Sequence, residues 1–217
     1  MRAAQPFQFF TASYLTRITN WKATNLAELR DALGNCSDGS IFYHTFQSLS
    51  RYHFLTEGFS NDFAQWVLAA CNRPELAELL ASLDIREYLS LAELRADLRR
   101  MVADYCEAHP EHAAQAGFEP LYFCESLEVT VPLGLEAATL EEFRAAVTHL
   151  SHASLHFHFL TSRLRLQLRT NDFSFWLANS LGLVNLARRT NGIDIYTNTL
   201  ESVREKLLAL VDQELTR

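Results

Sequence analysis

The heptapeptide SNDFAQW at residues 60–66 recurs as TNDFSFW at residues 170–176, and this repeat limits the fold more than any other sequence feature. A shift of 120 − 6 = 114 aligns residues 6–46 with residues 120–160 without a gap. The shift falls to 171 − 61 = 110 at the repeated heptapeptide, because the first copy has a longer connector before it. Self-similarity with a period of about 100 residues indicates a duplicated domain and not a short-repeat solenoid.

Each copy opens on a strand-like stretch, at residues 7–19 and 121–131, in which aromatic and β-branched residues are enriched. The stretches that follow repeat apolar residues at steps of three and four, the period of one helical face. The sequence therefore predicts a mainly α, internally duplicated helical fold with a short β element at the start of each copy. The two copies are expected to pack about a pseudo-twofold axis, like a fused dimer.

The predicted helices have recognisable starts. Asn25, Ser90 and Thr139 are each followed by Glu three residues on, the pattern of a capping box. Ser60 and Thr170 are the first residues of the repeated heptapeptide and are the expected N-caps of the helices that follow. The repeated Asp would then lie in the first turn, where a carboxylate is favourable, and the Phe and Trp would share the buried face.

Three segments are expected from this pattern: a first copy at residues 1–102, a linker at 103–119 and a second copy at 120–217. The two copies are predicted to pack as one globular unit. The linker is placed by its Pro and small polar residues, and its sequence HPEH, residues 109–112, is interpreted as solvated.

Composition limits the class of protein. With 48% hydrophobic residues and 15 Phe, the chain can bury a large aromatic core. A net charge of −7 argues against a nucleic-acid partner, and no apolar run is long enough to cross a membrane. The four cysteines are widely spaced without a CxxC pair, and the first residues do not resemble a signal peptide. A soluble, cytoplasmic protein with reduced thiols is expected.

Two histidines, His44 and His158, occupy equivalent positions in aromatic helices. A neutral buried imidazole needs hydrogen-bond partners for its ring nitrogens, and Asp62 or Asp172 at the start of the following helix is the expected partner. The sequence thus predicts two equivalent His–Asp contacts. A structural hydrogen bond is the simpler interpretation, and a role in a shared pocket is the alternative, since such pairs also occur in acid–base sites.

Arginines in TSRLRLQLRT, residues 161–170, could bind a phosphate or a carboxylate through their guanidinium groups, although ordinary surface charge is the simpler explanation. The leading hypothesis is a non-enzymatic accessory or binding module that takes a protein partner or a small anionic or sugar ligand. The predicted ligand-binding residues are His158, Arg163, Arg165, Asn171 and Asp172, followed by the first-copy residues His44, Asn61 and Asp62. A homo-oligomer is left open.

The alternative hypothesis is a metal-dependent enzyme. His149, His152 and His156 have the spacing of one helical face, and together with His158 they could bind zinc or iron. The first copy lacks this cluster, so the second copy would be catalytic and the first a scaffold. No HExxH, GxSxG, Walker or GxGxxG motif occurs, so no catalytic residue is assigned and no cofactor is predicted.

The motifs SIFYHTF and SNDFAQW, with their partners SLHFHFLTSRLRL and TNDFSFW, resemble a bacterial and archaeal family of unknown function over nearly the whole chain. The resemblance implies a soluble fold and a role beside carbohydrate-metabolising enzymes, and it supplies no catalytic residue. Members of that family tend to read Glu-Ala-Arg-Leu-Arg where residues 161–165 read TSRLR. If that Glu serves a site, this chain lacks it.

Overall fold

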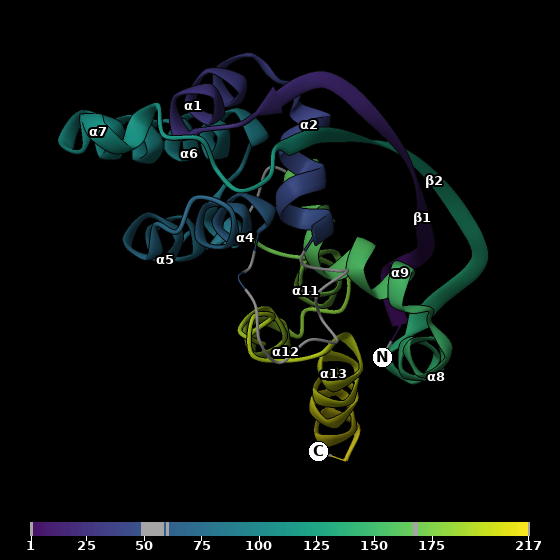
Figure 1. The fold of residues 1–217 in the computed structure, drawn as a ribbon. Coiled ribbons are helices and arrows are strands. Elements are labelled where there is room, and N and C mark those ends of the chain that lie inside the picture. The colour runs from purple at the N-terminus through teal and green to yellow at the C-terminus, as the bar shows by residue number, and fades with distance from the viewer. Residues whose placement is uncertain (1, 49–58, 60, 167–168, 217) are drawn as a thin grey trace. The chain divides into compact units, whose positions relative to one another are not determined.

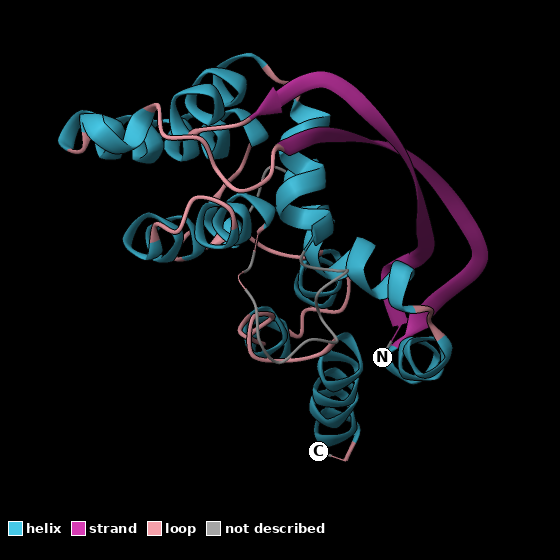
Figure 2. Ribbon diagram, in the orientation of Figure 1, coloured by secondary structure: helices cyan, strands magenta, loops and turns pink. Residues whose placement is uncertain are grey.

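The computed structural model describes residues 2–48, 59, 61–166 and 169–216 (Figure 1). The chain is mainly helical, as predicted, and it contains two long strands, β1 (Arg2–Ala23) and β2 (Leu121–Thr139), each preceding a helical region (Figure 2). The strands pair antiparallel in a two-stranded sheet. Among the described helices, none is both long and apolar enough to span a membrane.

Both strands are longer than the short β elements that the sequence predicts. β1 has 22 residues and β2 has 19, and β2 continues through Pro132 and Gly134. Pro is tolerated at a sheet edge, where its missing N–H breaks no ladder hydrogen bond, and in a two-stranded sheet both strands are edges. The Pro and Gly that suggest the end of the strand therefore do not end it.

Two compact units make up the chain. Unit 1 comprises residues 1–13 and 128–217, and unit 2 comprises residues 14–127. Each strand therefore contributes its first part to one unit and its second part to the other. The first residues of β1 belong with the helices of the second sequence copy, and the first residues of β2 belong with those of the first. The sequence copies and the compact units differ in this exchange of strand segments.

Unit 2 contains the helices of the first copy. In chain order they are α1 (Leu26–Asn35), α2 (Asp38–Phe42), the π-helical turn η1 (Tyr43–Gln47), α4 (Asp62–Ala69), α5 (Pro74–Ala81), the 3-10 turn η2 (Ile85–Glu87), α6 (Leu91–Ala108) and α7 (Pro110–Ala113). Helix α1 packs against α6, and α4 packs against α5. The segment expected to be a linker is helical over much of its first part, because α6 continues to Ala108 and Pro110 begins α7 at its first position.

Unit 1 repeats this order. Its helices are α8 (Leu140–His149), α9 (His152–His156), the π-helical turn η3 (Phe157–Thr161), α10 (Ser162–Leu166), α11 (Asp172–Asn179), α12 (Val184–Asn191) and α13 (Leu200–Leu215). Helix α8 packs against α13, and α11 against α12. Equivalent residues also share unusual backbone angles: Asn72 and Gly182, related by the shift of 110, have φ of 52° and 70° after α4 and α11.

Three of the predicted helix starts are confirmed. Asn25, Ser90 and Thr139 are N-caps, and each side chain accepts a hydrogen bond from the backbone N–H three residues on. The prediction for the repeated motif is wrong by one residue. Asn61 and Asn171 are the N-caps of α4 and α11, accepting from the third following N–H at 2.9 Å and 2.8 Å.

The Asn caps are favoured because Asn caps a helix as well as Ser does, and its amide adds a second hydrogen bond. Asn61 Nδ2 donates to the carbonyl of Leu80 at 3.0 Å, which joins α4 to the end of α5. Thr170 lies one residue before the cap, and Ser60 lies outside the described residues.

The predicted aromatic core is confirmed in both units. In unit 1 the ring of Phe173 lies 5.4 Å from those of Phe7 and Phe143, measured between centroids. In unit 2 the rings of Phe63 and Phe123 are 5.8 Å apart. The following core residues are at most 6% exposed: Phe7, Phe63, Trp66, Phe123, Phe143, Phe173 and Trp176. The Phe and Trp of each repeated motif thus share the buried face, as predicted.

Candidate functional site

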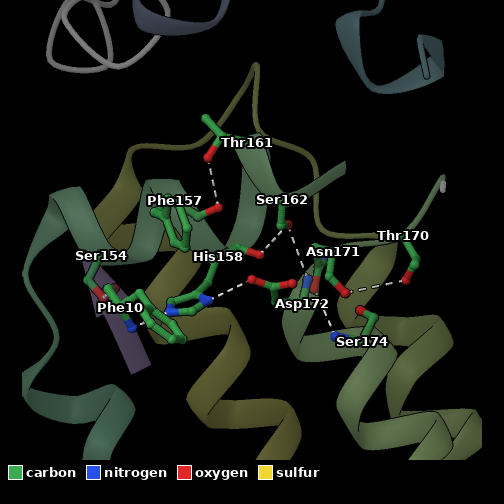
Figure 3. A network of polar contacts seen from close by, with 10 residues as sticks. All are labelled: Phe10, Ser154, Phe157, His158, Thr161, Ser162, Thr170, Asn171, Asp172 and Ser174. Atoms are coloured by element: carbon green, nitrogen blue, oxygen red, sulfur yellow. Dashed lines mark hydrogen bonds and ion pairs between the residues drawn. The ribbon is translucent and has the colours of Figure 1, made fainter. Parts of the chain in front are cut away.

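The π-helical turn η3 carries His158, both of whose ring nitrogens are engaged (Figure 3). Nδ1 lies 2.7 Å from Asp172 Oδ2, and Nε2 accepts a hydrogen bond from the backbone N–H of Phe10 at 2.8 Å. Because Nε2 is an acceptor, the ring proton is on Nδ1, which donates to the carboxylate. The imidazole is therefore neutral and held in one tautomer.

Unit 2 repeats this arrangement. His44 Nδ1 lies 2.8 Å from Asp62 Oδ2, and Nε2 accepts from the N–H of Cys124 at 3.0 Å. Phe10 and Cys124 are equivalent under the shift of 114. The two predicted His–Asp contacts are confirmed. The backbone donors were not predicted, because they come from the opening strand of the other copy and no local pattern indicates them.

The tryptophan of each motif also holds the exchanged strand. Trp176 Nε1 donates to the carbonyl of Gln5 at 2.7 Å, and Trp66 Nε1 donates to the carbonyl of Glu119 at 2.9 Å. Gln5 and Glu119 are again related by 114. The repeated motif thus makes the same three contacts in both copies. Its Asn caps a helix, and its Asp forms a hydrogen bond with a histidine. Its Trp donates a hydrogen bond to the backbone at or just before the opening strand of the other copy.

A serine extends the network in unit 1. Ser162 Oγ donates to the carbonyl of His158 at 2.7 Å and accepts from the backbone N–H of Asp172 at 3.2 Å (Figure 3). In unit 2 the equivalent Ser48 Oγ donates to the carbonyl of His44 at 3.0 Å. In unit 1 this hydroxyl group connects the π-helical turn to the start of α11.

The predicted ligand-binding residues of unit 1 come together, but in the interior. His158, Arg163, Asn171 and Asp172 are 1%, 3%, 0% and 8% exposed. Arg163 lies in α10, not in an irregular connector, and its Nη2 donates to Asn191 Oδ1 at 2.9 Å. The side chain of Arg165 lies outside the described part of the chain.

The first-copy set is arranged in the same way. His44, Asn61 and Asp62 lie together in unit 2, and His44 and Asn61 are 3% and 2% exposed. In both units these polar atoms bind one another and the protein backbone. The geometry is that of an internal hydrogen-bond network, which matches the structural interpretation of the His–Asp pairs; a ligand at these residues stays a prediction.

The three histidines expected on one helical face lie on two helices. Helix α8 ends at His149, Leu150 is extended, and Ser151 is the N-cap that starts α9, so His149 is on a different helix from His152 and His156. His152 Nε2 lies 3.1 Å from Glu201 Oε2, and His156 is only 2% exposed. The metal hypothesis for this cluster was based on one continuous helix, and the structure has two helices at these residues.

A cleft of about 580 Å³ lies in unit 2, at residues that the sequence did not single out. Residues of β1 and β2 and residues around the start of α2 line it: Arg17, Ile18, Thr19, Asn20, Trp21, Asn35, Ser37 and Glu125. This volume is within the usual range for small-ligand sites. The signal available in the sequence was Trp21, an aromatic residue within the polar run TRITNWKAT.

Glu125 is the acidic group of the cleft, and its carboxylate is firmly held. Ser37 Oγ donates to Glu125 Oε2 at 2.6 Å, and Arg17 Nη2 forms an ion pair with Oε1. The Ser37 hydrogen bond lowers the pKa of Glu125 below its ordinary value, and the Arg17 guanidinium adds to this against the opposing effect of burial. The carboxylate is therefore ionised at neutral pH and acts as a hydrogen-bond acceptor.

This pKa shift predicts a pH-dependent effect of Glu125→Gln on stability. Because the folded pKa is lowered, the carboxylate stabilises the fold above its unfolded pKa, and this contribution is lost as pH falls through the folded value. Urea unfolding of both proteins at neutral pH and at roughly pH 3 measures the difference. We expect a less stable variant at neutral pH and a smaller gap in acid. A gap that widens in acid would contradict the lowered pKa.

The equivalent positions of the second copy are apolar. Under the shift of 114, Arg17, Thr19 and Trp21 correspond to Val131, Leu133 and Leu135. These three residues and Val129, at alternate positions of β2, are 37–48% exposed. The duplicated strands have therefore diverged: one carries polar and aromatic groups at a cleft, and the other exposes aliphatic side chains.

Comparison with known proteins places this fold in a family. Residues 4–212 match the family of unknown function DUF5752, and the chain belongs to it. Among solved structures, the chain is similar to OrfY from Thermoproteus tenax, with 28% sequence identity and a TM-score of 0.86 over 100% of this chain and 99% of that one. The search of curated proteins found no match.

Proposed function

We propose that this chain is a non-catalytic binding module of carbohydrate metabolism, and that the cleft of unit 2 takes a small sugar. The observation that carries the proposal is Trp21, whose side chain is 41% exposed at a cleft with Asn20, Asn35 and the ionised Glu125. An exposed indole offers a flat apolar surface to the C–H face of a sugar ring. Amide and carboxylate groups can then bind its hydroxyls.

The chemistry of the cleft favours binding over hydrolysis. Glycoside hydrolysis commonly uses two carboxyl groups, one of them a general acid whose pKa is raised. Glu125 is the one carboxyl group among the lining residues that the structure describes, and its pKa is lowered. An ionised carboxylate held by Ser37 and Arg17 cannot donate a proton to a leaving group, but it can orient a ligand.

Trp21→Ala tests the proposal. Isothermal titration calorimetry of the full chain with neutral mono- and disaccharides, and with their phosphates, should find a sugar that binds the native protein. The variant should bind it at least about ten-fold more weakly, which is about 1.4 kcal/mol. The phosphates decide between a neutral and an anionic sugar ligand.

Phe118→Ala is the matched control, because Phe118 is an aromatic residue of unit 2 that is 96% exposed and does not line the cleft. Its sugar affinity should equal that of the native protein. Equal affinity of the Trp21 variant, or no binding of any sugar at millimolar concentration, would refute the proposal.

Three further proposals concern the origin of the two copies, the location of the protein and its partners. We propose that the copies descend from a twofold dimer whose subunits exchanged opening strands, which is supported by the equivalent contacts to Phe10 and Cys124. A cytoplasmic location is proposed from the four cysteines, all described and all free thiols. A protein partner or a second copy of the chain stays a prediction, favoured by the exposed apolar side chains of β2 between Val129 and Leu135.

A further inference from the structure

Three potential metal ligands meet at the junction of α6 and α7. His109 Nδ1 lies 3.8 Å from Glu111 Oε1, and His112 Nε2 lies 3.6 Å from the same oxygen. The potential ligand atoms of all three residues are within 4.8 Å of one another. Among the described residues, these three form the one group of at least three His, Cys, Asp or Glu side chains that lie this close together. The junction is part of unit 2 and does not line the cleft around Trp21.

The backbone brings the three side chains to one side. Helix α6 ends at Ala108, His109 has φ −134° and ψ 67°, and Pro110 starts α7 immediately afterwards. This change of direction stacks the imidazole rings of His109 and His112, with centroids 5.3 Å apart and planes 18° apart. Glu111 is between them in sequence, and its carboxylate is within 4 Å of both rings.

Tyr105, one turn earlier on α6, orients the second histidine. Its hydroxyl oxygen is 3.2 Å from His112 Nδ1, and its ring centroid is 4.5 Å from that of His109. If Nδ1 keeps the ring proton and donates it to the phenol oxygen, the lone pair of Nε2 is available on the side of Glu111. Partners of this kind, which fix the tautomer of a histidine ligand, are typical of metal sites in proteins.

We propose that His109 Nδ1, the Glu111 carboxylate and His112 Nε2 bind one divalent transition-metal ion of the zinc type. Ligands at about 2.0–2.1 Å in a tetrahedron are about 3.3 Å apart, so the two measured separations need to shorten by only a few tenths of an ångström. Two imidazoles and one carboxylate suit Zn²⁺ and neighbouring ions, whereas Mg²⁺ and Ca²⁺ prefer oxygen ligands. His109 and His112 are half-buried and Glu111 is exposed, which leaves the fourth position to water.

Titration of Zn²⁺ into the untagged full chain, first stripped with a chelator, tests the site by calorimetry. The native protein should bind one equivalent, and binding should raise its melting temperature, because an ion bound only by the folded state stabilises it. His109→Ala and His112→Ala should each weaken binding at least about 100-fold, since each removes one of three ligands. Their metal-free circular dichroism spectra should match that of the native protein.

Two further variants make the test specific. Tyr105→Phe should weaken binding by about 10–100-fold, as expected for a group that orients a ligand. His152→Ala is the matched control: this histidine also pairs with a carboxylate, Glu201, but it belongs to no group of three potential ligands within the described part of the chain, and its loss should leave the affinity unchanged. Absence of saturable Zn²⁺ binding, or native affinity in both His109→Ala and His112→Ala, would overturn the proposal.

Discussion

Replacing His158 with Phe is expected to lower the free energy of unfolding by about 3–5 kcal/mol, because it leaves two buried groups without a hydrogen-bond partner, at about 1–3 kcal/mol each and more for a charged group. The Phe ring enters an aromatic environment, because His158 lies 5.0 Å from Phe7 and 5.4 Å from Phe173, measured between ring centroids. Its two hydrogen bonds cannot be replaced. The Asp172 carboxylate loses the imidazole N–H and stays buried, and the Phe10 N–H loses its acceptor.

For a chain of this size, each kcal/mol corresponds to about 2–4 °C in melting temperature, so a decrease of roughly 6–20 °C should be seen by calorimetry. His152→Gln is the control, because that side chain is 42% exposed; it should melt close to the native protein. His158→Phe combined with Asp172→Leu should be less destabilised than the sum of the single changes, since the double change removes the buried charge as well. A native melting temperature for His158→Phe would rule out the structural role.

The His–Asp pairs could be predicted from the sequence because both residues are local to one copy and are repeated. Their second partners could not, because Phe10 and Cys124 belong to strand segments that pack with the other copy. A duplicated sequence indicates two similar units but does not decide which copy supplies each strand. That choice depends on contacts between residues that are far apart along the chain. Cys124 and His44 are separated by 80 residues, and Phe10 and His158 by 148 residues.

One error in the prediction comes from competition between local helix signals. The spacing of His149, His152 and His156 fits one helix, but Ser151 caps a new helix by accepting from Ser154 N–H at 3.1 Å. A serine at this position was a visible signal for a break. The cleft around Trp21 was missed for another reason: Ser37 and Glu125 are 88 residues apart, and only the fold brings them together.

Phe173→Ala is expected to lower the free energy of unfolding by about 3–5 kcal/mol, as found when a fully buried Phe is truncated. Phe173 is 0% exposed, and its ring lies 5.4 Å from the rings of Phe7 and Phe143. The change removes both the transfer free energy of the ring and its contacts with these neighbours. Because Phe7 belongs to the exchanged segment of β1, the cavity would loosen the strand as well as α11.

Phe175→Ala, two residues along the same helix, separates this packing effect from any change in helix propensity. Phe175 is 41% exposed, so its replacement by Ala should change the unfolding free energy by less than about 1 kcal/mol. Urea unfolding of both variants, followed by circular dichroism, measures the difference. A similar loss in the two variants would mean that the ring of Phe173 is not a core contact. A loss confined to Phe173→Ala would place the buried face of the repeated motif, which holds Asp172 beside His158, at the centre of unit 1.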